Sequence, residues 1–464
     1  MSEFQAVVMA AGSGSRMYPL TENIPKALLP VGNLPMIWYP INMLEKAGFE
    51  EVIVIVLEST ANQVSQVLTS ICGPKLKPDV VPIPDADMGT ADSLRHIREK
   101  IKKDFLVLSC DLITDVALHR LADIHRSYDA TFTALFAPIP ETSADREAAS
   151  NPKAKKTATN PYQRDYIGLD SEQDRLLLFA AEADLEESLT VRKSLLQRYP
   201  CINIITNLMD AHLYIFKKWV VDFLSENKSI NSVKGELIPY LVKKQFHKKK
   251  KKFSYPLGVD TASVSVGGPE DNKTDIFGFV NEDNITSVCR DLSSWSNSAT
   301  HNLIGSCIRC HAYVMEDGIC LRTNTLPMYM EANRLIPRKL PSLSAKEIPL
   351  LHPSVVIKPK SQVGKVDCMV DECVSIGEKV SVKKSVIGKH TTIGEKVKIS
   401  NSVIMDHVTI KEGCNIQGSI ICTNAYIKEN AVLKDCQVGN SHTIQEGADL
   451  KGEAIVAGQM MDFE

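Results

Sequence analysis

Aromatic residues are scarce in this chain and make up only 6% of its 464 residues. Long hydrophobic runs are missing too, since no stretch approaches the roughly 18 apolar residues that a membrane span needs. Neither sign of charge dominates, because 53 basic and 56 acidic residues give a net charge of −3. This balance excludes a chain-wide field that would hold nucleic acid or an anionic membrane. The hydrophobic fraction of 44% excludes global disorder.

The first residues do not read as a secretory signal. The first residues include an acid, Glu3, and early glycines, and they lack the basic segment of a secretory leader. The 12 cysteines are scattered from Cys72 to Cys436 and do not form a compact disulfide framework. We therefore expect free thiols and a cytosolic location. The length predicts two to four domains.

The last quarter of the chain carries a repeat. From about His352 onward, aliphatic residues recur in steps of six, six and five, which sum to 17, and Tyr426 is the one aromatic residue up to position 458. Neither an α-helix nor a continuous strand has this period. Three short segments per turn, each with one aliphatic residue inside, predict a parallel β-helix of about five coils. The three tracks are Val370, Ile387, Ile404, Ile421, Val438 and Ile455; Ile376, Ile393, Ile410, Ile427 and Ile444; and Val382, Ile399, Ile416, Leu433 and Leu450.

Aromatic rings are too large for such columns, so the repeat accounts for part of their scarcity. Glycines such as Gly377, Gly394 and Gly413 are expected near the corners. A solenoid of this kind is more often a scaffold and an interaction surface than a catalytic site.

The front of the chain alternates apolar runs with amphipathic segments. This alternation predicts a mostly parallel sheet covered by helices on both faces, with its ligand crevice at the carboxyl ends of the strands. The predicted strands are Phe4–Ala10, Val52–Leu57, Val80–Pro84, Phe105–Ser109 and Thr131–Phe136, and the predicted helices are Met36–Ala47, Ala91–Ile101 and Ala117–Tyr128.

A glycine-containing loop follows the first strand directly. Gly12 and Gly14 would let the backbone approach an anion, and Arg16 adds a planar cation. The dinucleotide fingerprint would need a third glycine where Met17 stands, and no P-loop lysine follows. A tight structural turn therefore remains an alternative for these residues taken alone.

The residues after this loop extend the pattern. The strings Tyr18-Pro19-Leu20-Thr21, Pro25-Lys26-Ala27-Leu28-Leu29-Pro30-Val31-Gly32, Gly89-Thr90-Ala91 and Leu106–Asp111 occur in an order that resembles the sugar-nucleotide pyrophosphorylases. The resemblance implies an α/β fold, with a nucleotidyltransferase-like, mostly parallel sheet followed by a C-terminal left-handed parallel β-helix. We expect the first domain at 1–340, with insertions near 141–164 and 243–300, and the β-helix at 350–458.

The same resemblance implies site residues for nucleotide binding. Gly12, Gly14, Arg16 and Lys26 would surround the triphosphate. Gly89 and Thr90 would contact the base, and Asp111 would hold a metal.

Three positions depart from the family's pattern. Arg322 stands where the family has a second metal-binding aspartate, and a guanidinium repels magnesium. Glu182 replaces the lysine that holds the sugar phosphate, and His212 replaces the glycine of an Asn-Ala-Gly turn. Together these changes predict that nucleotidyl transfer is lost, with no cofactor and no metal bound. An active sugar-1-phosphate guanylyl- or adenylyltransferase remains the alternative.

The strings also resemble a branch of this family found in the exchange factor for translation initiation factor 2. Asp87–Arg95, Leu106–Val116, Glu236–Val242 and Tyr329–Arg334 carry that resemblance. It implies a regulatory, non-catalytic subunit that pairs with the catalytic epsilon subunit and assembles with the alpha, beta and delta subunits. Contact with initiation factor 2, especially its GTP-binding gamma subunit, is also implied, whereas neither a membrane nor a nucleic acid is expected as a partner.

Two further strings could indicate a ligand or a partner. Residues 243–252 hold seven lysines and one histidine, and such a block is usually a solvated loop, with an acidic partner or RNA as the alternative. Cys307, Cys310 and His311 match the c-type haem string, but the reducing compartment and the apolar context favour coincidence.

Overall fold

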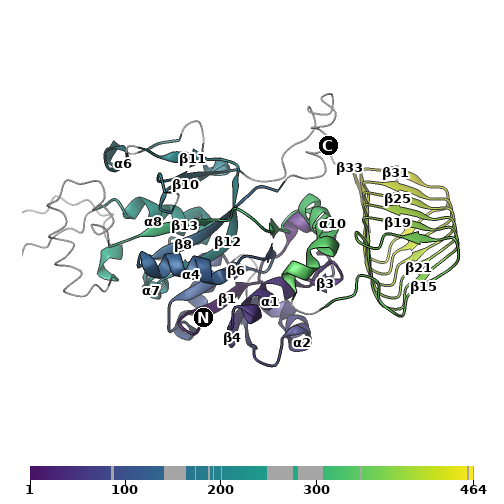
Figure 1. Ribbon diagram of the computed structural model, residues 1–464, viewed down its shortest axis with the longest axis horizontal. Helices are drawn as coiled ribbons and strands as arrows, with labels where there is room; N and C mark the ends of the chain where they lie inside the picture. The colour runs from purple at the N-terminus through teal and green to yellow at the C-terminus, as the bar shows by residue number, and fades with distance from the viewer. Residues whose placement is uncertain are drawn as a thin grey trace, which may run out of the picture.

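The computed structural model describes residues 1–84, 88–140, 164–172, 174–185, 189–191, 193–199, 201–247, 275–280, 307–344, 347–456 and 459–462. An α/β domain lies beside a β-helix, with helix α10 (Leu326–Leu343) between them (Figure 1). The expected insertions at 141–164 and 243–300 lie largely outside the described residues, as does the second half of the lysine block, residues 248–252. Among the described helices, none has both the length and the apolar character needed to cross a membrane.

A seven-stranded, mostly parallel sheet forms the centre of the first domain. Its order is β13-β8-β12-β6-β1-β4-β5, and β12 is antiparallel to both of its neighbours. The strands are β1 (Gln5–Met9), β4 (Glu51–Leu57), β5 (Lys77–Ile83), β6 (Phe105–Ser109), β8 (Phe132–Pro138), β12 (Leu208–Phe216) and β13 (Cys310–Val314). The mostly parallel sheet that the sequence predicts is therefore confirmed, with its five strands placed within a few residues.

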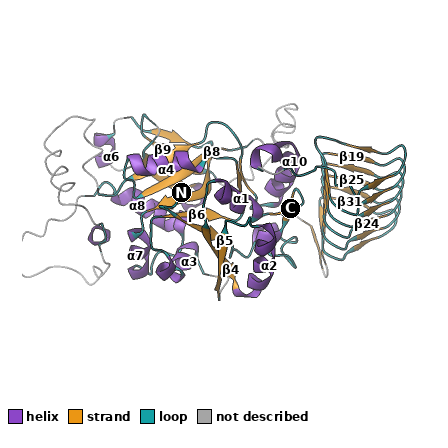
Figure 2. Cartoon of the chain, turned by 60° about the horizontal axis from the view of Figure 1, so that its bottom comes forward, coloured by secondary structure: helices purple, strands orange, loops and turns teal. Residues whose placement is uncertain are grey.

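Helices cover both faces of this sheet, as Figure 2 shows. The side chains of β1 alternate, because Val7 packs into one apolar core while Ala6 and Val8 pack into the other. One core is closed by α3 (Thr90–His96), α7 (Trp219–Glu226) and α8 (Ile238–Lys244), and the other by α1 (Trp38–Lys46), α2 (Ala61–Ile71) and α4 (Leu118–Ser127). The three helices predicted from the sequence are among these six.

Smaller elements surround the carboxyl edge of the sheet. A three-stranded sheet contains β9 (Asp165–Leu169), β10 (Leu176–Ala181) and β11 (Asn203–Ile205). Helix α6 (Lys193–Arg198) lies between β10 and β11 in the sequence. Strands β2 (Pro30–Val31) and β3 (Leu34–Pro35) form a hairpin. Strand β7 (Leu112–Thr114) pairs antiparallel with β14 (Cys320–Arg322), so that Arg322 lies opposite Leu112 and next to Asp111.

The β-helix has three parallel sheets, one for each side. The first contains β15 (Val356–Ile357), β18 (Ser375–Ile376), β21 (Thr392–Ile393), β24 (Thr409–Ile410), β27 (Tyr426–Ile427) and β30 (Thr443–Ile444). The second contains β16 (Gln362–Val363), β19 (Ser381–Lys383), β22 (Lys398–Ser400), β25 (Asn415–Gln417), β28 (Val432–Lys434) and β31 (Asp449–Lys451). The third contains β17 (Met369–Val370), β20 (Val386–Ile387), β23 (Val403–Ile404), β26 (Ile420–Ile421), β29 (Gln437–Val438), β32 (Glu453–Val456) and β33 (Gln459–Asp462).

The predicted aliphatic tracks are the core columns of this β-helix. Ile376 pairs with Ile393, and Ile393 with Ile410, so each track residue stacks on the residue 17 positions later. Ile410 is 1% exposed, and nearly all other track residues are buried as well. The left-handed β-helix predicted from the sequence is thus confirmed. Its first two sheets have six strands each, one for each coil, where the spacing predicted about five coils.

The corners differ from the expectation. Residues with φ between 49° and 74° recur every 17 positions in three columns, and most of them are Asn, Asp, Lys or His rather than glycine. Of the three glycines named from the sequence, Gly413 has this conformation, with φ of 74°. Gly377 and Gly394 instead allow close stacking, because a Cβ on Gly377 would lie 2.5 Å from the backbone oxygen of Gly394.

Helix α10 joins the two domains. Its buried Tyr329 and Ile336 pack between the first domain and the third sheet of the β-helix, where Val403 and Ile420 point outward into the same core. The side chain of Asn33 donates a hydrogen bond of 3.0 Å to the backbone oxygen of Ile387. These contacts fix the β-helix against the side of the α/β domain.

Candidate functional site

The glycine loop lies at the carboxyl end of β1 and lines a cavity of about 710 Å³. Gly14 has φ of 74°, and the hydroxyl of Thr21 donates to its carbonyl oxygen at 3.1 Å. Within the described part of the chain, no backbone N–H of residues 12–16 donates to another group. The structure therefore brings Gly12, Gly14 and Arg16 together with Lys26 around one cavity, as the sequence predicted.

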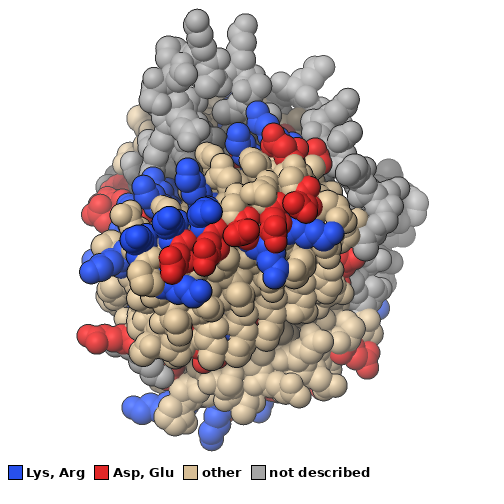
Figure 3. Space-filling view, turned by 90° about the vertical axis from the view of Figure 1, so that its right-hand side faces the viewer, with Lys and Arg blue, Asp and Glu red and all other residues tan. Residues whose placement is uncertain are grey.

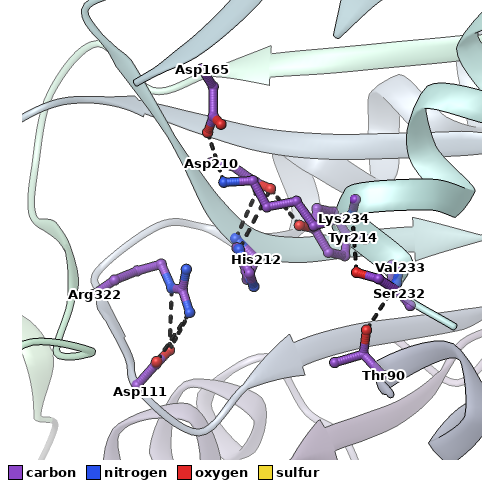
Figure 4. Close-up of polar contacts among 11 residues, drawn as sticks. Thr90, Asp111, Asp165, Asp210, His212, Tyr214, Ser232, Val233, Lys234 and Arg322 are labelled. Carbon is purple, nitrogen blue, oxygen red and sulfur yellow. Dashed lines mark hydrogen bonds and ion pairs between the residues drawn. The ribbon is translucent and has the colours of Figure 1, made fainter. Parts of the chain in front are cut away.

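Asp111 is fully buried next to this cavity and is held by two cations. Lys26 Nζ lies 2.6 Å from Asp111 Oδ2, and Arg322 Nη2 lies 3.0 Å from the same oxygen. Arg322 also donates to Asp111 Oδ1 from both Nε and Nη2, each at 3.2 Å. Figure 4 shows the guanidinium of Arg322 facing the carboxylate of Asp111. Burial favours a raised pKa for Asp111, but the charges of Arg322 and Lys26 outweigh it and hold that pKa well below the ordinary range.

The pairing of β7 with β14 accounts for this arrangement. Thr323, the residue after Arg322, donates to the backbone oxygen of Asp111 through its N–H at 3.0 Å and its hydroxyl at 3.1 Å. The position that the sequence aligned with a second metal-binding aspartate thus lies directly against the first. Here it supplies a guanidinium, which occupies the carboxylate that a magnesium ion would need.

A second group of charges lies on the opposite wall, around β12. Lys234 Nζ forms an ion pair of 2.8 Å with Asp165 Oδ2, and Tyr214 donates its hydroxyl to Asp210 at 2.5 Å (Figure 4). Burial raises the pKa of Asp165, and Lys234 opposes that rise. The other oxygen of Asp165 has no hydrogen-bond partner among the described residues.

His212 projects into the cavity from an irregular part of β12. The strand's register shifts between Asp210 and Tyr214, and His212 has φ of 52°, a conformation that favours glycine. Its side chain is 25% exposed. Desolvation, followed by the charges of Arg322 and Lys234, lowers its pKa well below the usual value, so the imidazole is neutral at pH 7. It fills space where the glycine of the resembling family would leave room.

Glu182 does not point its charge at the cavity centre. It follows β10, its side chain is exposed, and the cavity wall there is formed by Ala181 and Ala183. The cation on this side is instead Lys234, from the turn of helix at Val233–Leu237. The sequence reasoning missed Lys234 and Asp165, because no local string connects them; their ion pair depends on tertiary folding.

Gly89 and Thr90 do not join the cavity. Their turn packs against Asn231 and Val233, because Ala91 donates its N–H to Asn231 O at 2.9 Å and Val233 donates its N–H to Thr90 Oγ1 at 2.8 Å. A Cβ on Gly89 would lie 2.1 Å from the backbone oxygen of Asn231. Space near this turn is thus occupied by the chain's own backbone.

The fold and the site define a nucleotidyltransferase-like protein with a left-handed β-helix. The family model described as nucleotidyl transferase matches residues 5–146, and the model described as the EIF2B subunit epsilon LbH domain matches residues 350–456. A mannose-1-phosphate guanyltransferase of Candida albicans is 32% identical over 146 residues, which is 30% of this chain and 39% of that protein.

Much longer matches are found with one translation factor. The translation initiation factor eIF2B subunit gamma of Schizosaccharomyces pombe is 33% identical over 387 residues, covering 82% of this chain and 74% of that protein. The subunit of the same name in Dictyostelium discoideum is 31% identical over 409 residues, covering 84% and 88%. The chain belongs to the family of eIF2B gamma subunits.

Proposed function

We propose that this chain is a regulatory, non-catalytic subunit of the exchange factor that replaces GDP by GTP on translation initiation factor 2. It pairs with the epsilon subunit and assembles with the alpha, beta and delta subunits in the cytosol. Long matches to gamma subunits support this role, as does a β-helix that fits the family model named for the epsilon subunit. We place the domain division at 1–340 and 350–458 and propose contact with the GTP-binding gamma subunit of initiation factor 2.

The observation that carries the absence of catalysis is the environment of Asp111. Nucleotidyl transfer needs a cation that neutralises charge on the triphosphate, and oxygen ligands hold that cation. In this chain the buried carboxylate already binds Lys26 and Arg322. A magnesium ion at this position would have to displace one of them and then bear the repulsion of the guanidinium.

The second candidate function is an active sugar-1-phosphate guanylyl- or adenylyltransferase. Arg16, Lys26 and the glycine loop around the cavity favour it. Pyrophosphate release decides between the two, measured with purified chain, magnesium, GTP or ATP, and hexose 1-phosphates. We expect no turnover above that of an Asp111→Asn control. Turnover that this substitution abolishes would refute the non-catalytic proposal.

The remaining cavity could still hold an anionic ligand. We propose Gly12, Gly14, Arg16 and Lys26 as the phosphate side of a vestigial nucleotide site, without a contribution from Gly89 and Thr90. Calorimetry with GTP, ATP and a sugar nucleotide tests this site, with Arg16→Ala as the variant. Equal binding by the variant and the unmodified chain would place the ligand elsewhere.

Assembly is tested separately from catalysis. Co-expression of this chain with the other four exchange-factor subunits should give one complex that stimulates release of labelled GDP from initiation factor 2. Omitting this chain should reduce that rate. If the complex forms and acts equally well without this chain, the proposed role is wrong.

A further inference from the structure

The first coil of the β-helix, residues 350–366, ends the solenoid on one side and is called the open end here. Strand β15 pairs with β18 and β16 pairs with β19, and neither has a second neighbour among the described strands. Figure 1 places β15 as the lowest labelled strand of the β-helix. Strand edges of this kind offer unpaired backbone N–H and C=O groups to another chain.

The core columns of the β-helix are exposed at the open end. Leu351 and Ile357 are 45% and 38% exposed, whereas Val370 and Ile376, their partners in the second coil, are 2% and 0% exposed. Val356 and Val366 add exposures of 61% and 65%. These four residues are among the seven large hydrophobic side chains that are exposed in the described structure. The open end is therefore an apolar patch rather than scattered single residues.

The opposite end of the β-helix is different. Strand β33 turns back and pairs antiparallel with β32, which covers one of the three strand edges. The last coil exposes Gln445, Glu446 and Lys451, and the described exposed large hydrophobic residues include none from this coil. The contrast between the two ends shows that an apolar terminus is not a general property of this solenoid.

Charge distinguishes the open end further. Residues 350–366 contain Lys358, Lys360 and Lys365 and no Asp or Glu, and within the described ranges these lysines form no ion pair. Glutamates recur at 17-residue intervals from Glu378 to Glu446, but the matching position in the first coil is Pro359. Figure 3 shows an acidic row crossing the β-helix, with a group of basic side chains above and around its left end and a few others below its right half.

We propose that the open end binds an extended segment of a partner protein in which aliphatic residues alternate with aspartate or glutamate. The segment's backbone pairs with the free edge of β15, its aliphatic side chains cover Leu351 and Ile357, and its acids meet Lys358 and Lys360. A second copy of this chain fits less well, because two open ends would bring like charges together. This interaction goes beyond the proposed function and does not depend on the exchange activity.

Titration of the full chain with a short labelled peptide of alternating valine and glutamate tests the proposal. We expect saturable binding below about 1 mM. The double variant Lys358→Glu/Lys360→Glu should weaken binding by about fivefold or more, since each lost attraction becomes a repulsion. The same variant should gain affinity for a peptide of alternating valine and lysine. The matched control is Lys434→Glu/Lys451→Glu, which changes the net charge by the same amount at other coils. This control should bind the valine–glutamate peptide as tightly as the unmodified chain does.

Val356→Asp tests the apolar part of the surface. Its side chain is mostly exposed, so the melting temperature should stay unchanged while peptide binding is lost. The proposal is overturned if neither peptide binds, or if the control pair weakens binding as much as the variant at Lys358 and Lys360. It is also overturned if light scattering detects a dimer of this chain that Val356→Asp dissociates, since a second copy would then be the occupant.

Discussion

Replacing Arg322 by methionine removes the guanidinium from Asp111 while keeping a side chain of similar length. Asp111 is fully buried, and Lys26 would remain as its one charged partner at 2.6 Å. Removing one partner of a buried ion pair typically costs ~3–5 kcal/mol, because the remaining charge stays desolvated. Since Lys26 still compensates part of that charge, we expect a loss of about 3 kcal/mol in the free energy of unfolding at pH 7.

The pH dependence identifies the cause of this loss. In the unmodified chain the pKa of Asp111 is depressed, so its contribution is present above the unfolded pKa of about 3.9 and is lost only as the pH falls through the lower folded value. Without Arg322, burial is opposed by Lys26 alone, and the pKa of Asp111 rises. The variant then takes up a proton in mild acid, and its deficit in unfolding free energy should shrink as the pH falls.

Urea unfolding of the full chain at several pH values, followed by intrinsic fluorescence, measures both quantities. The double variant Asp111→Asn/Arg322→Met should recover much of the stability, because the buried carboxylate is gone and the Lys26 side chain, 14% exposed at the cavity, stays within reach of water. A loss below about 1 kcal/mol at pH 7, or a deficit that does not change with pH, would refute the proposed electrostatic role of Arg322.

Three further outcomes are expected. Ile410→Asp places an unpaired carboxylate in a core column and should lower the melting temperature sharply; an unchanged melting temperature would contradict the column assignment. Burial lowers the pKa of both His125 and His311 to about 3, so the free energy of unfolding should fall as the pH drops below about 6.5. Replacing both histidines by glutamine should make the free energy of unfolding depend less on pH in this range, as measured by urea unfolding at several pH values. The buried hydroxyl of Ser402 donates to the backbone oxygen of Ser400 and accepts from the backbone N–H of Ser419, one coil later. Ser402→Ala should therefore lower the free energy of unfolding in urea by ~1–3 kcal/mol, whereas Ser375→Ala, at an exposed position, should leave it almost unchanged.

The β-helix could be predicted well because its period connects sequence and structure directly. Each coil repeats the same path, so a residue such as Ile393 meets its counterparts in the coils before and after it. The corners were less predictable, since the left-handed conformation is adopted by residues as different as Lys396, Asn430 and Asp435. Coil-to-coil hydrogen bonds stabilise these corners, and composition alone does not reveal them.

The candidate site was predictable where its residues belong to one ordered string. Gly14, Arg16 and Lys26 follow the first strand closely, and the fold gathers them as expected. Lys234 was missed because its ion pair with Asp165 joins segments far apart in the sequence. The exclusion of Gly89 from the cavity was also missed, because only the folded chain shows which backbone fills its turn.

The survival of Asp111 in this sequence is weak support for catalysis, although it looks at first like a retained metal ligand. A buried carboxylate must be compensated by something, and here Lys26 and Arg322 provide that compensation without a metal. Each member of the trio therefore has a structural role, since Asp111 is the anion that both cations share and each cation offsets part of the desolvation of that carboxylate. The identity of the residue at position 111 alone cannot distinguish a metal site from an internal ion-pair network. The charge of the neighbouring side chain at position 322 makes that distinction, because a cation there replaces the metal.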